Sequence, residues 1–255
     1  DLHAEQKRGE HLKQFVPYME KYFAQAVGAG LCTDFKVYIV QQSDDGRKFN
    51  RGKLLNIGYD LAKKEGRSVF VFHDVDLLPS PELLPNYCKV PAEGRPVHIA
   101  KIWERYNEND DYVGGIVAWN GGDYEAINGF PNNYWGWGGE DDEMMRRCKS
   151  KWGKEFRMAA PKAGSITDLE DMALDEKLAF LKGHKDWKCN VRWELRDEHK
   201  KTWRSNGLTN LNYSVTERAN LAASTEIVTV DVLLNGAGQH DEVAGQNSSP
   251  NDFSK

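Results

Sequence analysis

One stretch decides how this chain is interpreted: Asn132-Asn133-Tyr134-Trp135-Gly136-Trp137-Gly138-Gly139-Glu140-Asp141-Asp142-Glu143. Adjacent like charges repel and glycines are costly to order, so such a run adds little to folding stability. It suits a binding site, because a Trp ring offers a flat face to a sugar, Gly admits a ligand to the backbone, and a carboxylate can take a proton from a hydroxyl. The alternative is an acidic first turn of a helix after a Gly-rich loop, which the helix dipole favours.

A second acidic motif lies upstream: Val69-Phe70-Val71-Phe72-His73-Asp74-Val75-Asp76-Leu77-Leu78-Pro79. Its β-branched and aromatic beginning predicts a buried strand that ends in Asp-x-Asp. In an open α/β sheet, ligands bind beyond the carboxyl ends of the strands. Asp74 and Asp76 at such an edge suit a hard divalent cation, which in turn suits a diphosphate. We expect His73 to be a packed or hydrogen-bonded histidine.

The composition limits the classes of partner. A length of 255 residues is enough for one large domain with its own core. The formal net charge of -5 argues against a nucleic-acid binder or a basic membrane-surface module. The sequence contains no apolar run long enough for a membrane span and no visible signal peptide. Because the chain begins at Asp1 instead of Met, we expect that an upstream anchor or signal has been trimmed.

The four cysteines show no metal-ligand spacing. They allow three disulfide connectivities, and the sequence selects none of them. Scattered thiols in a chain of this length fit a reduced compartment better than a secreted one. The cysteines are Cys32, Cys88, Cys148 and Cys189.

Periodicity predicts an α/β order of elements. A helix is expected over residues 12–23, interrupted at Pro17, followed by strands over 35–40 and 69–72 with a helix over 53–64 between them. Strand–helix–strand at this spacing is a βαβ unit, so a mixed, mostly parallel sheet is expected. Later expectations are a surface loop over 79–96, strands over 97–100, 112–119 and 227–234, helices over 141–151 and 174–181, and a solvated helix over 193–204. We expect one domain over residues 1–235 and a disordered tail over 236–255.

Five segments match one known family in sequence and in order: residues 49–59, 73–79, 112–115, 127–143 and 206–213. The most specific of them is Trp135-Gly136-Trp137-Gly138-Gly139-Glu140-Asp141-Asp142. On these segments the chain resembles the β-1,4-galactosyltransferase family (glycosyltransferase family 7), inverting enzymes of GT-A fold that use a uridine-diphosphate sugar and manganese. The resemblance implies a GT-A α/β fold with a Rossmann-like nucleotide-binding half and a central mixed, mostly parallel sheet.

The resemblance also implies roles for residues on the donor side. Arg51 would contact the nucleotide diphosphate, Asp74 would hold the nucleotide sugar, and Asp76 would ligate the metal. Tyr112 would set the donor choice, and a tyrosine there resembles enzymes that use galactose more than those that use N-acetylgalactosamine.

On the transfer side, the resemblance implies that Trp137 stacks on or bridges donor and acceptor, with Gly138 and Gly139 beside it. Glu140 would orient the substrate and Asp141 would be the general base. Elementary chemistry agrees, because inverting transfer needs a base for the acceptor hydroxyl and a cation beside the leaving diphosphate.

The chain departs from the family where further metal ligands are expected. The family has His or Met/His there, whereas the spacing from Asp141 leads to Glu170, in a segment without His. We predict Glu170 as a ligand, assisted by Asp168 or Met172, and an all-oxygen set of this kind favours Mn²⁺ or Mg²⁺ over Zn²⁺. In the alternative, Thr167-x-x-Glu170 is a capping box with Asp168 as N-cap. His184 is a rival ligand.

These expectations lead to one functional hypothesis. The chain is expected to be a metal-dependent inverting enzyme that transfers galactose from UDP-galactose to a sugar hydroxyl, with a glycan or glycoconjugate as acceptor. The alternatives are the same fold with UDP-N-acetylgalactosamine or UDP-glucose, or an inactive carbohydrate-binding or partner-dependent subunit. We expect a monomer, in the Golgi lumen or in the cytoplasm of a bacterial or virus-infected cell. A disulfide of some relatives at Cys88 is expected to be absent, because its partner position falls at Val69.

Overall fold

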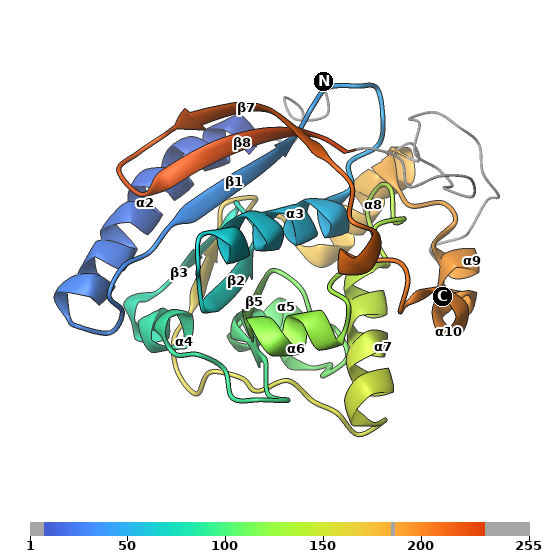
Figure 1. Ribbon diagram of the computed structural model, residues 1–255, viewed down its shortest axis with the longest axis horizontal. Coiled ribbons are helices and arrows are strands. Elements are labelled where there is room, and N and C mark those ends of the chain that lie inside the picture. Colours follow the sequence, from blue (N-terminus) through green and yellow to red (C-terminus); the bar gives the residue numbers. More distant parts are fainter. Residues whose placement is uncertain (1–7, 185–186, 233–255) are drawn as a thin grey trace.

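The computed structural model describes residues 8–184 and 187–232 (Figure 1). The tail expected over 236–255 lies outside the described residues. The helices are α2 (Arg8–Gly28), α3 (Arg51–Lys64), α4 (Leu84–Cys88), α5 (Glu104–Asn107), α6 (Gly121–Ala126), α7 (Glu140–Trp152), α8 (Leu174–Gly183), α9 (Arg192–Asp197) and α10 (His199–Thr202). The strands are β1 (Val37–Gln42), β2 (Val69–His73), β3 (Leu77–Pro79), β4 (Val97–His98), β5 (Ile116–Asn120), β6 (Ile166–Asp168), β7 (Ser214–Asn220) and β8 (Thr225–Asp231). Short 3₁₀ turns lie at Pro81–Leu83, Ile99–Ile102 and Leu208–Asn210.

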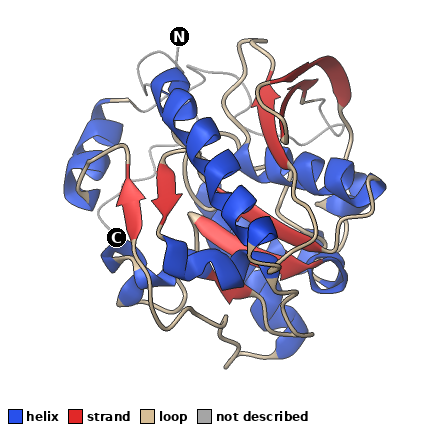
Figure 2. Ribbon diagram, turned by 90° about the vertical axis from the view of Figure 1, so that its left-hand side faces the viewer, coloured by secondary structure: helices blue, strands red, loops and turns tan. Residues whose placement is uncertain are grey.

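The mixed α/β class is confirmed, and helices lie on both sides of the strands (Figure 2). The strands form three groups, ordered β1-β8-β7, β2-β5-β4 and β3-β6. β1 pairs with β8 in parallel, and the other four ladders are antiparallel. The pairing is therefore less parallel than expected.

The expected βαβ unit is present as an order of elements but not as a paired unit within the described residues. α3 joins β1 to β2, yet β1 takes its partner from the end of the chain and β2 takes β5. Local spacing predicts that two strands follow each other, whereas the partner of each strand is decided by contacts across the whole chain. A cleft of about 1780 Å³ lies between these strands and is lined by both of them.

α2 contributes its buried face to one of the core clusters. Its buried face includes Phe15, Met19 and Tyr22, at helical spacing, and it packs against α4. The interruption predicted at Pro17 is wrong, because the helix continues through this proline. Pro17 lies on the exposed side, where water can bond the carbonyl that loses its partner.

Three other predictions need correction. Residues 79–96 are not simply a loop, because α4 lies within them and buries Leu84 and Tyr87. The strand predicted from residue 112 begins at Ile116, because Gly115 has a φ of 69° and breaks the extended backbone. The solvated helix predicted over 193–204 is two short helices, α9 and α10, and it is partly buried through Leu195.

Candidate active site

The N-terminus of α7 places two carboxylates in the cleft. Gly139 is the N-cap residue, with a φ of 100°, and Glu140 and Asp141 begin the helix. A side chain at Gly139 would collide with the Tyr134 ring, so glycine is required for this turn. The acidic first turn is therefore present, and the same turn lines the cleft.

Arg51, the first residue of α3, joins the two acidic motifs. Its Nε and Nη2 donate to Oδ1 of Asp74 at 2.9 and 2.8 Å. Its Nη1 lies 3.0 Å from Oδ1 of Asp141 and 3.4 Å from Oε1 of Glu140. The structure therefore brings together four residues that the sequence placed in one site.

Burial governs the titration of the two α7 carboxyls. Burial raises the pKa of Asp141 well above its usual range, and the Arg51 guanidinium opposes that rise. Burial likewise raises the pKa of Glu140. A carboxyl with a raised pKa is a stronger base once ionised, so Asp141 has the character expected of a group that accepts a proton.

The loop before β5 closes one side of this group. A Cβ atom placed on Gly114 would stand 2.7 Å from Oδ2 of Asp141 and 3.1 Å from the Tyr106 hydroxyl. Burial raises the pKa of Tyr112, whose ring lies 5.1 Å from that of Tyr106. The absence of a side chain at Gly114 therefore leaves room for the Asp141 carboxylate.

A second group of carboxylates lies beside the first. Asp76, Asp168 and Glu170 each offer an oxygen, and these oxygens all lie within 4.8 Å of one another. The antiparallel pairing of β3 with β6 sets Asp168 opposite Leu77, and the Leu169 amide donates to the Asp76 carbonyl at 2.7 Å. This pairing brings the predicted ligands together from positions about 90 residues apart.

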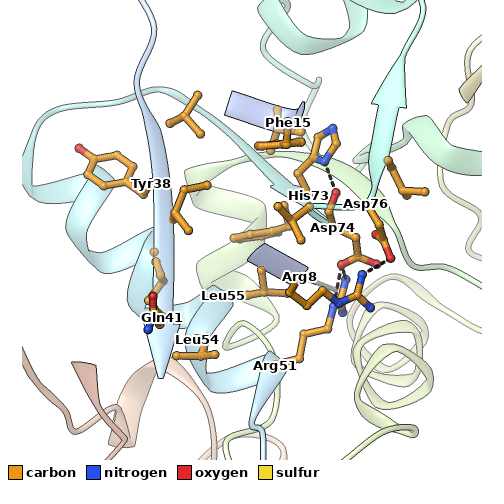
Figure 3. Close-up of a pocket in the computed structure, with 18 of the residues that line it drawn as sticks. Arg8, Phe15, Tyr38, Gln41, Arg51, Leu54, Leu55, His73, Asp74 and Asp76 are labelled. Atoms are coloured by element: carbon orange, nitrogen blue, oxygen red, sulfur yellow. Dashed lines mark hydrogen bonds and ion pairs between the residues drawn. The ribbon is translucent and has the colours of Figure 1, made fainter. Parts of the chain in front are cut away.

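Cationic side chains face this second group. Arg8 forms an ion pair with Asp76 and lies 3.7 Å from Glu170. Lys177 of α8 lies 2.5 Å from Glu170, and Arg105 lies 3.3 Å from Asp168. Burial would raise the pKa of Asp76, but the charge of Arg8 holds it below its usual range. Figure 3 shows Arg8 and Arg51 pointing from α2 and α3 toward Asp76 and Asp74.

The structure places each of the residues considered for the ligand segment. The capping box is wrong, because Asp168 lies in β6 and the next helix, α8, starts at Leu174 with Ala173 as N-cap. Oδ1 of Asp168 instead accepts from the Glu170 amide at 2.9 Å, which fixes the turn after β6. His184 lies at the end of α8, where it stacks on Phe180, outside the carboxylate group.

Two further predictions concern His73 and Met172. His73 is packed and hydrogen-bonded, as expected: its Nδ1 donates to the Asp74 carbonyl at 2.8 Å, and its Nε2 lies 2.9 Å from the Tyr87 hydroxyl. Burial lowers the pKa of His73, which favours the neutral ring. Met172 lines the cleft, and its carbonyl accepts from Arg105 at 2.6 Å.

The Trp-Gly loop lines the cleft directly before α7. Trp137, Gly138 and Gly139 line it, and Trp137 is partly exposed. The Trp137 amide donates to the Trp187 carbonyl at 2.6 Å, and the Cys189 amide donates back at 3.1 Å. The segment after α8 therefore holds the loop in place.

Sequence reasoning missed the three cationic residues of the second group. Arg8 lies at the start of an amphipathic helix, and its partner is 68 residues away. One available signal was the excess of carboxylates: a buried acidic group needs compensating charge, so basic residues must lie nearby.

The chain matches two family models and several known proteins. A family model described as the N-terminal region of glycosyl transferase group 7 matches residues 4–89, and one described as the N-terminal domain of galactosyltransferase matches residues 94–172. Beta-1,4-galactosyltransferase 4 from Homo sapiens is 33% identical over 185 residues, covering 71% of this chain and 50% of the relative. Beta-1,4-galactosyltransferase 1 from Mus musculus is 32% identical over 229 residues, covering 88% and 52%. The chain thus spans about half the length of these curated relatives.

Two solved structures of a beta-1,4-galactosyltransferase also match the chain. A mutant of Drosophila beta-1,4-galactosyltransferase 7, in complex with manganese, UDP-Gal and xylobiose, matches with a TM-score of 0.68 and 25% identity over 88% of this chain and 89% of that chain. The catalytic domain of the Drosophila enzyme in complex with xylobiose matches with a TM-score of 0.68 and 26% identity. These neighbours agree with the GT-A fold expected from the sequence. Within the described residues, none of the helices combines the length and apolar character that crossing a membrane requires.

Proposed function

Because this chain belongs to the β-1,4-galactosyltransferase family, we propose that it is a metal-dependent inverting glycosyltransferase that moves galactose from UDP-galactose to a sugar hydroxyl, forming a β-1,4 link. The observation that carries the proposal is the presence of two carboxylate groups in one cleft, Asp141 with Glu140 and Asp76 with Glu170. One group suits an acceptor hydroxyl and the other a cation beside a diphosphate. The relative solved with manganese, UDP-Gal and xylobiose supports this donor and a carbohydrate acceptor.

The residues of the second group fit a hard divalent cation. Asp76, Asp168 and Glu170 offer oxygen atoms only, which favours Mn²⁺ or Mg²⁺ over Zn²⁺. The cationic Arg8 and Lys177 beside them indicate that positive charge is needed at this position. When bound, the cation would neutralise charge that gathers on the leaving diphosphate.

The chain's own cations would hold the donor. Arg51 and Arg8 lie at the edge of the carboxylate groups, and each can turn from a carboxylate to a phosphate, since guanidinium groups pair with both. Asp74 would hold the nucleotide sugar. Tyr112 would face the donor sugar, which favours galactose, and UDP-N-acetylgalactosamine and UDP-glucose are the competing donors.

Asp141 would carry out the proton transfer. Its carboxylate takes the proton of the acceptor hydroxyl while that oxygen forms a bond to the anomeric carbon, and the bond to the diphosphate oxygen breaks on the opposite face. Glu140 would orient the substrate, and Trp137 with Gly138 and Gly139 would bridge donor and acceptor. Burial strengthens the case for Asp141, because a raised pKa makes the ionised carboxylate a better proton acceptor.

The remaining expectations belong to the same proposal. Residues 1–235 would form one catalytic domain, acting as a monomer on a glycan or glycoconjugate. The proposed compartment is the Golgi lumen, and the cytoplasm of a bacterial or virus-infected cell is the alternative.

The proposal is tested by UDP release from a panel of UDP-sugars with Mn²⁺, Mg²⁺ or EDTA, with and without xylobiose as acceptor. UDP-galactose should be used most rapidly, and EDTA should stop release. Faster use of another UDP-sugar would keep the mechanism and overturn the role of Tyr112. UDP binding without turnover of any donor would instead favour the inactive binding module.

Asp141→Asn separates an enzyme from a binding module. The variant should lose roughly 10²- to 10⁴-fold in kcat and still bind UDP. The matched control is Asp142→Asn, because Asp142 is the adjacent, exposed carboxylate of the same turn. Equal losses in both variants would count against Asp141 as the base.

A further inference from the structure

Two cysteines meet where α2 packs on α4. Cys88 is the last residue of α4, and Cys32 follows the turn at the end of α2. Both cysteines pack against the same core cluster, and the Cys32 thiol is a neighbour that raises the pKa of Cys88. The Tyr87 ring, next to Cys88, lies 5.5 Å from that of Tyr22 and 5.7 Å from that of Phe23. The two cysteines thus lie at a packed helix–helix interface.

The turn that carries Cys32 is held to the helix before it. The Gly30 amide donates to the Val27 carbonyl at 3.0 Å, and the Leu31 amide donates to the Ala26 carbonyl at 2.9 Å. Gly30 has a φ of 70°, which lets the chain reverse at this point. Backbone bonds therefore fix the turn that leads to Cys32 against the end of α2.

Exposure separates this pair from the other two cysteines. Cys32 and Cys88 are partly exposed and line the cleft, whereas Cys148 and Cys189 are buried. A small thiol reagent can therefore reach the first pair more readily than the second. Burial, together with the neighbouring Cys32 thiol, raises the pKa of Cys88 to about 12. Oxidation of the pair thus needs a thiol–disulfide reagent and time, because the Cys88 thiolate is scarce at neutral pH.

We propose that Cys32 and Cys88 are a redox pair that closes to an intramolecular disulfide in the presence of a disulfide oxidant such as oxidised glutathione. One cysteine thiolate attacks oxidised glutathione, forms a mixed disulfide and releases one glutathione thiolate. The other cysteine then attacks the mixed disulfide, forms the Cys32–Cys88 bond and releases the second glutathione. Two protein thiols are oxidised, and one oxidised glutathione is reduced to two thiols.

The bond would fasten the end of α2 to α4. It would close a loop of more than fifty residues containing β1, α3 and β2, so it would remove much of the freedom of the unfolded chain. We expect the midpoint of thermal unfolding to rise by roughly 5–15 °C on oxidation. The pair does not depend on the proposed transfer reaction, and its test needs no substrate.

The first experiment treats the full chain with a series of glutathione redox buffers, denatures it, blocks the remaining thiols and maps the peptides without reduction. The expected result is two blocked thiols, Cys148 and Cys189, and one cross-linked pair, Cys32 with Cys88. Four blocked thiols in the most oxidising buffer would overturn the proposal. A different pair, or a disulfide between two molecules, would overturn it equally.

Variants provide a second measurement. Cys32→Ser and Cys88→Ser should each abolish the rise in unfolding temperature that oxidised glutathione gives. Cys148→Ala is the matched control and should keep the rise, since Cys148 is buried on α7 away from this interface. A rise that persists in Cys32→Ser would show that the stabilisation has another source and would contradict the proposal.

Discussion

The Asp141 carboxylate occupies the space that a side chain at Gly114 would need, with Oδ2 only 2.7 Å from the position of a Cβ atom. Gly114→Ala should therefore push the base out of place while leaving its chemistry unchanged. We expect kcat to fall by about 10²-fold, the loss typical of a displacement near 1 Å. Steady-state kinetics with UDP-galactose and xylobiose measures this change.

Gly28→Ala is the control for that substitution. Gly28 ends α2, and a Cβ atom there would meet no other atom within 4 Å. The control should keep its kcat. If Gly114→Ala keeps it as well, Asp141 either moves freely or is not the base.

The carboxylates of the second group should set metal affinity. Asp168→Asn and Glu170→Gln each remove one negative charge from a set whose oxygens lie within 4.8 Å. We expect Mn²⁺ binding to weaken by about 10- to 100-fold in each variant, the range typical of altered metal sites. Titration calorimetry with Mn²⁺ and UDP measures this affinity directly. Asp171→Asn is the control, because Asp171 is exposed, has a φ of 48° that Asn also tolerates, and lies next to the site.

Arg8 should compete with the metal for Asp76. Its guanidinium pairs with the carboxylate that the cation would use, so Arg8→Gln should tighten binding of Mn²⁺ alone several-fold. The same change should weaken binding of UDP, because a phosphate partner is lost. Opposite shifts in two calorimetric titrations are expected. Unchanged Mn²⁺ affinity would contradict the competition.

The acid limb of the pH–rate profile should report the ionisation of the Asp141 carboxyl. A base must be ionised, so kcat falls as pH drops through its pKa, and burial places that pKa above the usual value for Asp. The acid limb should therefore lie at higher pH than for an exposed aspartate. Glu140→Gln removes a like charge that contributes to the rise, so the limb should move to lower pH. A limb that moves upward would contradict this assignment.

Arg147 should be the most costly residue of α7 to replace. Its buried guanidinium donates to Glu143 at 3.1 Å and to the carbonyls of Gly129 and Asn206 at 2.9 and 2.7 Å. Arg147→Met leaves these acceptors and a buried carboxylate without their donor, so we expect a loss of roughly 3–5 kcal/mol in the free energy of unfolding. Denaturant unfolding measures this loss of free energy. Arg146→Met, on the neighbouring partly exposed position, should change stability by about 0.5 kcal/mol or less.

Sequence patterns predicted the helices and strands that carry candidate site residues better than the elements around them. α3, β2 and α7 were predicted close to their observed bounds, because each combines a clear period with an end signal, such as the acidic start and basic end of α7. α4 was missed, although Pro85 stands in its first turn, a position that proline favours.

Strands without alternation could not be predicted. All seven residues of β7 are exposed, so it has no buried face and shows no period of two. β6 has three residues and exists through its pairing with β3. That pairing also brings Asp168 to Asp76, which explains why the sequence left a helix cap open as the alternative to a ligand role.

The length of α2 links the position of Arg8 to packing far along the same helix. A helix of 21 residues is about 30 Å long, with Arg8 at one end and the turn of Cys32 near the other. A tilt of 5° about the Cys32 end would carry Arg8 by roughly 3 Å, about the length of a hydrogen bond. Tyr22 touches no proposed substrate position. Substitutions at Tyr22 should therefore alter donor affinity by changing the tilt of α2.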